Sequence, residues 1–189
     1  RIPGDSLSRM KALVDEFAAR QPDTDFVPGL VEADARWLEF VRLPLLLDMV
    51  SQLIGEDFLN WGSSLFGKPA LAGPETPWHQ DGSYWPLEPM NVVSLWVAGT
   101  SSTVKNGCMR VIPGTQNKRL LKPSEMMQVY TEKYVLDLAI HPDQIDDSDA
   151  VDIEMEAGDV SVHNPFIIHG SNANLSDQWR MGLTLRYIP

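Results

Sequence analysis

The segment Trp78-His79-Gln80-Asp81 places an imidazole and a carboxylate two positions apart. In an extended strand, residues i and i+2 point to the same side, so we expect His79 and Asp81 to face one point. A second histidine would complete a set of two histidines and one carboxylate, which binds Fe(II) and leaves positions open for other ligands. The pair alone is a weak signal, because a surface histidine next to a capping aspartate gives the same pattern.

The second histidine that we favour is His169, in the run Phe166-Ile167-Ile168-His169-Gly170-Ser171. We expect an apolar strand that ends at this histidine, followed by small residues that let a ligand approach the backbone. A buried histidine with satisfied hydrogen bonds is the alternative interpretation. His163 competes as a ligand, but it precedes Asn164-Pro165, where we predict a turn between strands, and we rank it second.

Arg180 follows on the next predicted strand and indicates a site for an anion. A buried guanidinium needs a negative partner, and its planar set of donors matches a carboxylate at two points. The distal carboxylate of 2-oxoglutarate would satisfy it. A structural salt bridge with one of the many acidic residues is the alternative.

Helices are predicted before residue 58. Apolar residues at spacings of three and four predict a helix over Leu7–Arg20, stopped by Gln21-Pro22-Asp23. A second helical stretch runs over Ala33–Ile54, with a break at Pro44. We expect this helical part, 1–57, and a β part, 58–189, to form one domain.

Short apolar runs that alternate with turn residues predict an antiparallel β structure after residue 58. Asn106-Gly107 predicts a hairpin between 92–104 and 108–112, and we expect another between 151–155 and 160–162.

The last strand, 180–187, has one apolar face and one polar face that carries Arg180. A barrel with a polar interior and helices packed outside fits both faces.

A formal charge of −11 makes nucleic acids and anionic membranes improbable partners and disfavours an acyl-CoA substrate, unless a local basic patch overrides it. No apolar run is long enough to span a membrane. The single cysteine, Cys108, suits a reducing compartment, and we expect a cytoplasmic location. The sequence does not indicate an oligomeric state, and we make no prediction of one.

The chain resembles the phytanoyl-CoA dioxygenase family from about Leu59 to Tyr187. The order and spacing of the shared segments are more specific than any one of them. In sequence, these segments are 78–86 (WHQDGSYWP), 95–98 (LWVA), 106–108 (NGC), 111–115 (VIPGT), 158–159 (GD), 169–171 (HGS) and Arg180. The helical run 37–55 is also similar to the region that precedes the barrel in this family. The resemblance implies a mainly β fold, a double-stranded β-helix or jelly roll.

The same resemblance implies Fe(II), O2 and 2-oxoglutarate, and hydroxylation of a small molecule. It makes His79, Asp81 and His169 the iron ligands. Related halogenases lack the ligand carboxylate, so the presence of Asp81 favours hydroxylation. One departure from the family is Gln116, where relatives often have a histidine.

The resemblance also implies the surroundings of the iron. Arg180 becomes the anchor of the 2-oxoglutarate carboxylate, with Ser171 supporting it and Trp96 lining the same pocket. Tyr84 and Trp85 fall in the segment that borders the substrate. Two rivals remain at this point: a cupin-like metalloenzyme that does not use 2-oxoglutarate, and a metal-stabilised binding protein without turnover.

Overall fold

Two antiparallel sheets face each other in the computed structural model, which describes residues 1–21, 25–130 and 134–189. The larger sheet has the strand order β1-β2-β11-β4-β9, and the smaller sheet has the order β3-β10-β5-β8. The strands are β1 (Phe26–Pro28), β2 (Leu59–Lys68), β3 (Thr76–His79), β4 (Val93–Ala98), β5 (Met109–Val111), β6 (Met127–Gln128), β7 (Leu138–Ala139), β8 (Val151–Ile153), β9 (Val160–His163), β10 (His169–Ser171) and β11 (Arg180–Ile188). Strands β6 and β7 pair as a separate small ribbon.

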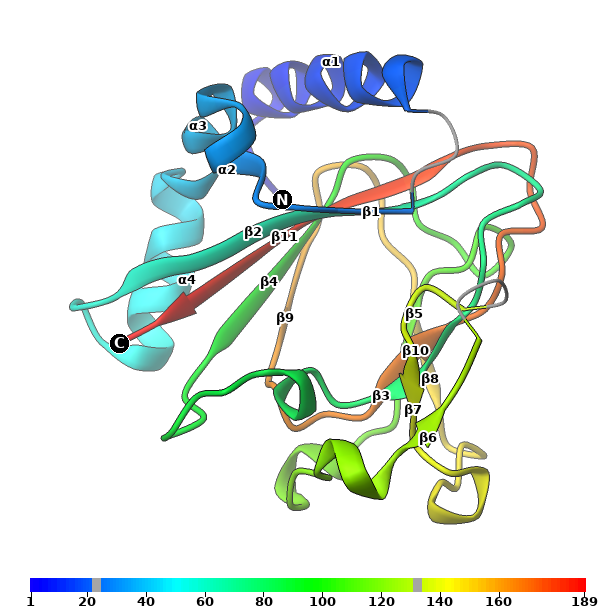
Figure 1. The fold of residues 1–189 in the computed structure, drawn as a ribbon. Helices are drawn as coiled ribbons and strands as arrows, with labels where there is room; N and C mark the ends of the chain where they lie inside the picture. The colour runs from blue at the N-terminus through cyan, green and yellow to red at the C-terminus, as the bar shows by residue number, and fades with distance from the viewer. Residues whose placement is uncertain (22–24, 131–133) are drawn as a thin grey trace.

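The helices lie on the outer face of the larger sheet, away from the smaller one (Figure 1). They are α1 (Gly4–Arg20), α2 (Leu30–Ala33), η1 (Ala35–Trp37), α3 (Leu38–Val41) and α4 (Pro44–Ile54), and further single turns are η2 (Asp81–Tyr84), η3 (Thr115–Asn117), η4 (Pro123–Glu125) and η5 (Pro142–Gln144). The predicted break at Pro44 is confirmed, since a new helix starts there. The first helix ends at Arg20, and the predicted stop at Pro22-Asp23 lies outside the described residues.

Strand β11 shows why the helices belong on this side. Its side chains alternate, and Met181, Leu183, Leu185 and Tyr187 are buried in one core with apolar residues of α1 and α4. The Tyr187 hydroxyl donates to the Val41 carbonyl oxygen at 2.7 Å, so the polar end of this ring is also satisfied. The other face of β11 is turned to the space between the sheets. The prediction of one apolar and one polar face is therefore confirmed.

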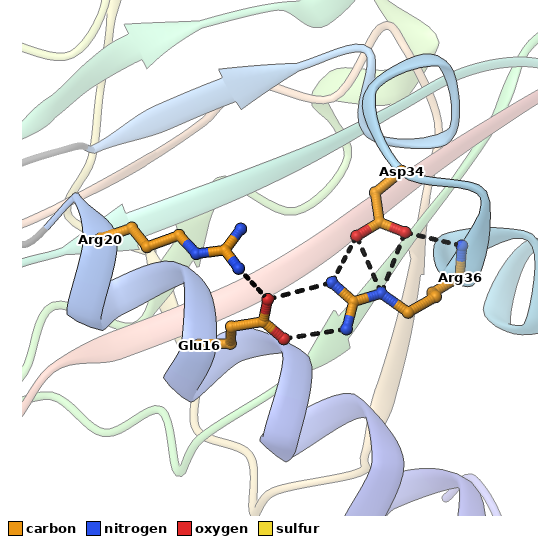
Figure 2. Close-up of polar contacts among 4 residues, drawn as sticks. All are labelled: Glu16, Arg20, Asp34 and Arg36. Atoms are coloured by element: carbon orange, nitrogen blue, oxygen red, sulfur yellow. Dashed lines mark hydrogen bonds and ion pairs between the residues drawn. The ribbon is translucent and has the colours of Figure 1, made fainter.

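A surface network also joins α1 to the turn before α3 (Figure 2). The Arg36 guanidinium donates to Glu16 at 2.9 Å and to Asp34 at 2.6 Å, while Arg20 pairs with the same Glu16. The Asp34 carboxylate also accepts from the Arg36 backbone N–H, which caps η1. All four side chains are partly exposed, so the network links α1 to η1 but contributes little to the free energy of unfolding.

Both predicted hairpins are wrong. Asn106-Gly107 does form a turn, with Gly107 at a φ of 77°, but β4 and β5 on its two sides belong to different sheets. Likewise, β8 pairs with β5 and β9 pairs with β4. The chain crosses from one sheet to the other at each of these turns, so neighbours in sequence are not neighbours in a ladder.

This crossing decides which strands meet around the interior. Strands β3 and β10, which carry the predicted histidine ligands, are adjacent in the smaller sheet, with His79 opposite His169. Strand β11, which carries Arg180, lies at the centre of the larger sheet, between β2 and β4. Within the described residues, no helix is long and apolar enough to cross a membrane.

Candidate metal centre

The side chains of His79, Asp81 and His169 converge in the space between the sheets. One oxygen of Asp81 lies 3.2 Å from His79 Nε2 and 3.7 Å from His169 Nε2. One possible ligand atom from each of the three residues lies within 4.8 Å of the other two. Two donor atoms bound at right angles, each about 2.1 Å from a first-row dication, are about 3 Å apart. The spacing therefore fits a metal ion held by all three.

Backbone carbonyls orient the two imidazoles. His79 Nδ1 donates to the Pro77 carbonyl oxygen at 2.8 Å, and His169 Nδ1 donates to the Ile167 carbonyl oxygen at 3.1 Å. A proton held at Nδ1 leaves a lone pair on Nε2, which faces Asp81 in both cases. Both rings are thus fixed in the tautomer that a metal ligand needs.

The electrostatics of the cluster favour an ionised Asp81 carboxylate and a neutral His169 imidazole. Burial opposes ionisation of Asp81, but its polar contacts with His163 and His79 outweigh this effect and hold the pKa of the carboxyl well below its usual range. Burial lowers the pKa of His169 to about 3, and the neighbouring His79 adds to this effect. An anionic oxygen and unprotonated nitrogens are the forms that bind a divalent metal.

Local backbone structure differs slightly from the prediction. Asp81 is not in the strand of His79 but begins η2, and the i, i+2 relation persists because Gln80 is extended. The turn and bend lie at residues 165–167, so His169 opens β10 and does not end an apolar strand. Neither change alters the direction in which the two side chains point.

His163 is closer to the cluster than predicted. It does not lie in a turn but ends β9, where it pairs with Ser94, because the turn begins only after it. Its Nε2 lies 3.5 Å from the second oxygen of Asp81, while its Nδ1 is buried without a partner among the described residues. His163 therefore contacts the Asp81 oxygen that faces away from His79 and His169, and it stands outside the group of three possible ligands.

Arg180 faces the same cavity from the larger sheet. Its guanidinium is buried over the Trp96 ring, 5.4 Å from the ring centroid, and its Nε has no hydrogen-bond partner in the described part of the chain. Burial lowers the pKa of Arg180 to about 10, so the group stays cationic at neutral pH. The alternative of a structural salt bridge has no support among the described residues, and the position suits an incoming anion.

Gly182 explains how Trp96 can lie where it does. A Cβ at residue 182 would lie 1.9 Å from the nearest indole atom, so the ring occupies the space that a side chain would need there. The layers are therefore Gly182, then Trp96, then Arg180. Ser171 lines the same cavity from β10, and its hydroxyl donates to Thr76 Oγ1 at 3.0 Å.

Tyr84 and Trp85 lie further from the metal cluster. The Tyr84 hydroxyl donates to the Leu138 carbonyl oxygen at 2.9 Å, and its ring meets His79 edge to face. Trp85 lines an adjoining pocket of about 260 Å³, where it contacts Trp61 edge to face. The structure thus separates the two residues, and only Trp85 lines a pocket beside the cavity.

Sequence reasoning assigned no role to two residues at this site. Arg186 lines the metal cavity and the adjoining pocket, with its guanidinium over the Trp85 ring. Its place on the polar face of 180–187 was the available signal. Gln80 is buried and bonds the backbone of Arg119, Leu121 and Phe166, so it fixes the segment between the two ligands. No sequence signal pointed to these partners.

Comparison with known proteins agrees with this geometry. The family model for Phytanoyl-CoA dioxygenase (PhyH) matches residues 6–182. A probable phytanoyl-CoA dioxygenase of Caenorhabditis elegans is 32% identical over 158 residues, which cover 79% of this chain and 49% of the relative. The peroxisomal phytanoyl-CoA dioxygenase of Bos taurus is 30% identical, with 82% of this chain and 47% of the relative covered. The chain thus spans about half the length of these curated relatives.

Among solved structures, the non-haem monooxygenase ThoJ in its apo form has a TM-score of 0.74 and 29% identity, covering 96% of this chain and 66% of that chain. The same protein has also been solved as a nickel complex. These likenesses confirm the predicted mainly β fold with helices outside. A family model that covers most of the chain, together with these relatives, shows that the chain belongs to the phytanoyl-CoA dioxygenase family.

Proposed function

We propose that this chain carries the active site of a non-haem Fe(II)- and 2-oxoglutarate-dependent dioxygenase that hydroxylates a small molecule. One observation carries the proposal. Three convergent metal-binding side chains and a buried arginine without a carboxylate partner in the described residues line one cavity. A metal site alone would suit many proteins, but an unpaired cation beside it fits a dicarboxylate cosubstrate.

In this proposal His79 Nε2, His169 Nε2 and one oxygen of Asp81 hold the metal from one side. Bound iron(II) would supply the redox chemistry that couples decarboxylation of 2-oxoglutarate, with release of succinate and CO2, to hydroxylation of the substrate by O2. The protein itself supplies geometry and exclusion of water. The two backbone carbonyls behind the imidazoles keep the ligands in place without any adjustment when the metal binds.

Arg180 would receive the distal carboxylate of 2-oxoglutarate, and Trp96 would hold the guanidinium in position. Ser171 and Thr76 offer hydroxyl groups along the same wall of the cavity. A two-point charged hydrogen bond in a buried site contributes about 1.5–3 kcal/mol. Orientation of the cosubstrate therefore rests chiefly on Arg180.

The test is anaerobic titration of 2-oxoglutarate into the Fe(II)-loaded wild type and the Arg180→Ala and Arg180→Lys variants. We expect a visible metal-to-cosubstrate charge-transfer band in the wild type and a dissociation constant at least about tenfold higher for the Ala variant. Lys should restore binding only in part, because it lacks the planar fork. Fe(II) affinity should stay unchanged in both variants, since Arg180 is not a ligand.

Two other results would redirect the assignment. A cupin-like metalloenzyme that does not use 2-oxoglutarate would bind Fe(II) but give no charge-transfer band. The wild type and the two Arg180 variants would then bind 2-oxoglutarate equally weakly. A metal-stabilised binding protein would unfold at lower temperature without metal and show no succinate with any small metabolite. In either case Arg180 would be a structural residue.

We also propose a cytoplasmic location, on the basis of the single cysteine, Cys108, which is buried and free. The mammalian relative is named as peroxisomal, so the two compartments are the alternatives to separate. Imaging of the full-length protein together with a peroxisomal marker does so. Overlap with the marker would contradict the cytoplasmic assignment.

A further inference from the structure

The cavity that holds the three possible metal ligands is small, and it encloses about 60 Å³. A metal ion and the chelating end of a cosubstrate would fill it, because sites for whole small molecules commonly measure at least about 300 Å³. A primary substrate must therefore rest mostly in an adjoining pocket. Three pockets share lining residues with the cavity: one of about 260 Å³ through Arg186, one of about 320 Å³ through His163, and one of about 280 Å³ through Thr76 and Ser171. The first of these combines a buried cation with aromatic walls.

The pocket shared through Arg186 opens from the inner face of the larger sheet. Arg186 lies opposite Gly62 on β2, and Ser64 and Phe66 follow at alternate positions on the same face. Phe26 on β1 pairs with Phe66, so the apolar floor extends to the edge of the sheet. The pocket is thus a continuation of the surface that carries the metal cavity.

Arg186 is equipped to bind a ligand at this boundary. Its guanidinium lies 5.4 Å from the centroid of the Trp85 ring, and one terminal nitrogen donates to Ser64 Oγ at 3.0 Å. Its Nε is buried and has no partner among residues 1–21, 25–130 and 134–189. Trp61 stands edge to face against Trp85 and forms the side wall. A ligand with an acceptor oxygen and an apolar body would bind both the Nε–H donor of Arg186 and the tryptophan walls of the pocket.

Charge balance indicates which acceptor fits. In the chain alone, the Asp81 carboxylate acts on Arg186 and opposes the lowering of its pKa by burial. With a dication bound, Asp81 would neutralise half of the metal charge. One charge of a dianionic cosubstrate would neutralise the remaining metal charge, and its second charge would neutralise Arg180. The charge of Arg186 would then face only the exposed carboxylate of Glu32 among the described residues that line its pocket. Lys68, another buried cation, does not line the cavity and donates to the Pro74 carbonyl oxygen.

We propose that Arg186 binds an anionic group of the primary substrate, and that Trp61, Trp85 and Phe26 contact its apolar body. The substrate class is therefore a small monoanion, such as a carboxylic acid with a ring or branched hydrocarbon body. This inference rests on the proposed oxygenase function and adds the substrate class to it. Glu32 stands at the rim of the pocket and is exposed, so it would weaken but not cancel the attraction.

Benzoate and its neutral counterpart benzamide are suitable probes, because they share a ring and differ in charge. Binding is measured by the broadening of their proton resonances with protein loaded with Mn(II) and saturated with N-oxalylglycine, which occupies the Arg180 side. The paramagnetic metal broadens only a probe that lies near it. We expect benzoate to be broadened and bound more tightly than benzamide, and Arg186→Gln to weaken benzoate by at least about tenfold. Glu32→Gln should strengthen benzoate binding.

A matched control is Arg110→Gln. Arg110 also stacks on a tryptophan, 5.7 Å from the centroid of Trp78, and it pairs with Asp152 at 2.9 Å. It lines the adjoining pocket of about 280 Å³, but neither the metal cavity nor the pocket of Arg186. Arg186→Lys provides a second variant that keeps the charge, and it should retain part of the benzoate affinity. Thermal unfolding of each variant shows whether the fold survives.

The proposal is overturned if benzoate and benzamide bind alike, if neither binds the wild type, or if Arg186→Gln and Arg110→Gln bind benzoate equally. Broadening that instead disappears on changing His163 would place the substrate in the pocket that His163 lines, and broadening that disappears in Arg110→Gln would place it in the pocket that Thr76 and Ser171 line. The titration of N-oxalylglycine is read separately. If that ligand fails to bind the Mn(II)-loaded wild type, the proposed function fails first. If it binds and benzoate does not discriminate, only the substrate class fails.

Discussion

The contact between Gly182 and Trp96 allows a stringent test of how the cosubstrate site is held. In Gly182→Ala the new Cβ would lie 1.9 Å from Trp96 Cζ2 and 2.0 Å from Cε2. Carbon atoms in contact are about 3.5 Å apart or more, so the indole must move by about 1.5 Å. Overpacking of this kind costs about 1–3 kcal/mol of unfolding free energy. The guanidinium of Arg180 would lose its support, which is about 0.5–2 kcal/mol for a cation over a tryptophan ring.

That second quantity corresponds to 2-oxoglutarate binding that is about two- to thirtyfold weaker. Calorimetry under anaerobic conditions measures the 2-oxoglutarate affinity of the metal-loaded protein, and urea unfolding measures stability. Gly4→Ala is the control for the general effect of replacing a glycine, since a Cβ there meets nothing within 4 Å. Adding Trp96→Phe to Gly182→Ala should recover stability, because the smaller ring removes the clash.

A Gly182→Ala variant that binds 2-oxoglutarate like the wild type, and unfolds within about 0.5 kcal/mol of it, would refute the layered arrangement. The same conclusion would follow if Trp96→Phe had the same effect on stability in the presence and absence of Gly182→Ala, since two contacting residues should not act independently.

Three further predictions follow from the site. Asp81→Ala should lose Fe(II) affinity and turnover with the urea midpoint nearly unchanged, and a variant with wild-type turnover would contradict the ligand set. His169→Ala should lose Fe(II) affinity by a larger factor than His163→Ala in the same metal titration, and the reverse order would make His163 the ligand. Burial lowers the pKa of Lys68 from 10.5 to about 7. The unfolded chain therefore binds the extra proton between these values, so wild-type stability rises with pH there, by at most about 1.4 kcal/mol per pH unit. Lys68→Met should lose this rise in urea unfolding across that interval, and an unchanged slope would show that Lys68 keeps its ordinary pKa.

Sequence was sufficient for the local part of the site. An extended segment brings His79 and Asp81 to one point whatever the rest of the fold does. The alternation along 180–187 likewise sorts polar from apolar faces, and it places Arg180 and Arg186 on the inside. The Pro44 break and the end of the first helix at Arg20 are also local effects, and they were predicted correctly.

Pairing between strands was beyond local reasoning. Asn106-Gly107 has the turn chemistry of a hairpin, but the turn carries the chain from one sheet to the other. The position of His163 depends on the pairing of β9 with β4, so a local turn signal at Asn164-Pro165 misplaced it. Gln80 contacts the backbone of two segments that are distant in sequence, 119–121 and Phe166, and only the assembled fold reveals them.

The central place of β11 has a consequence for synthesis of the protein on the ribosome. This strand lies between β2 and β4, so the larger sheet lacks its central strand until residues 180–188 have left the exit tunnel. Until then β2 and β4 each present an unpaired edge, which is prone to aggregation. The three proposed metal ligands are made before Arg180, so a nascent chain would carry them before it carries the proposed cosubstrate anchor. Chaperone demand should therefore persist until residues 180–188 emerge, and ribosome-bound chains stalled before residue 180 should remain sensitive to protease.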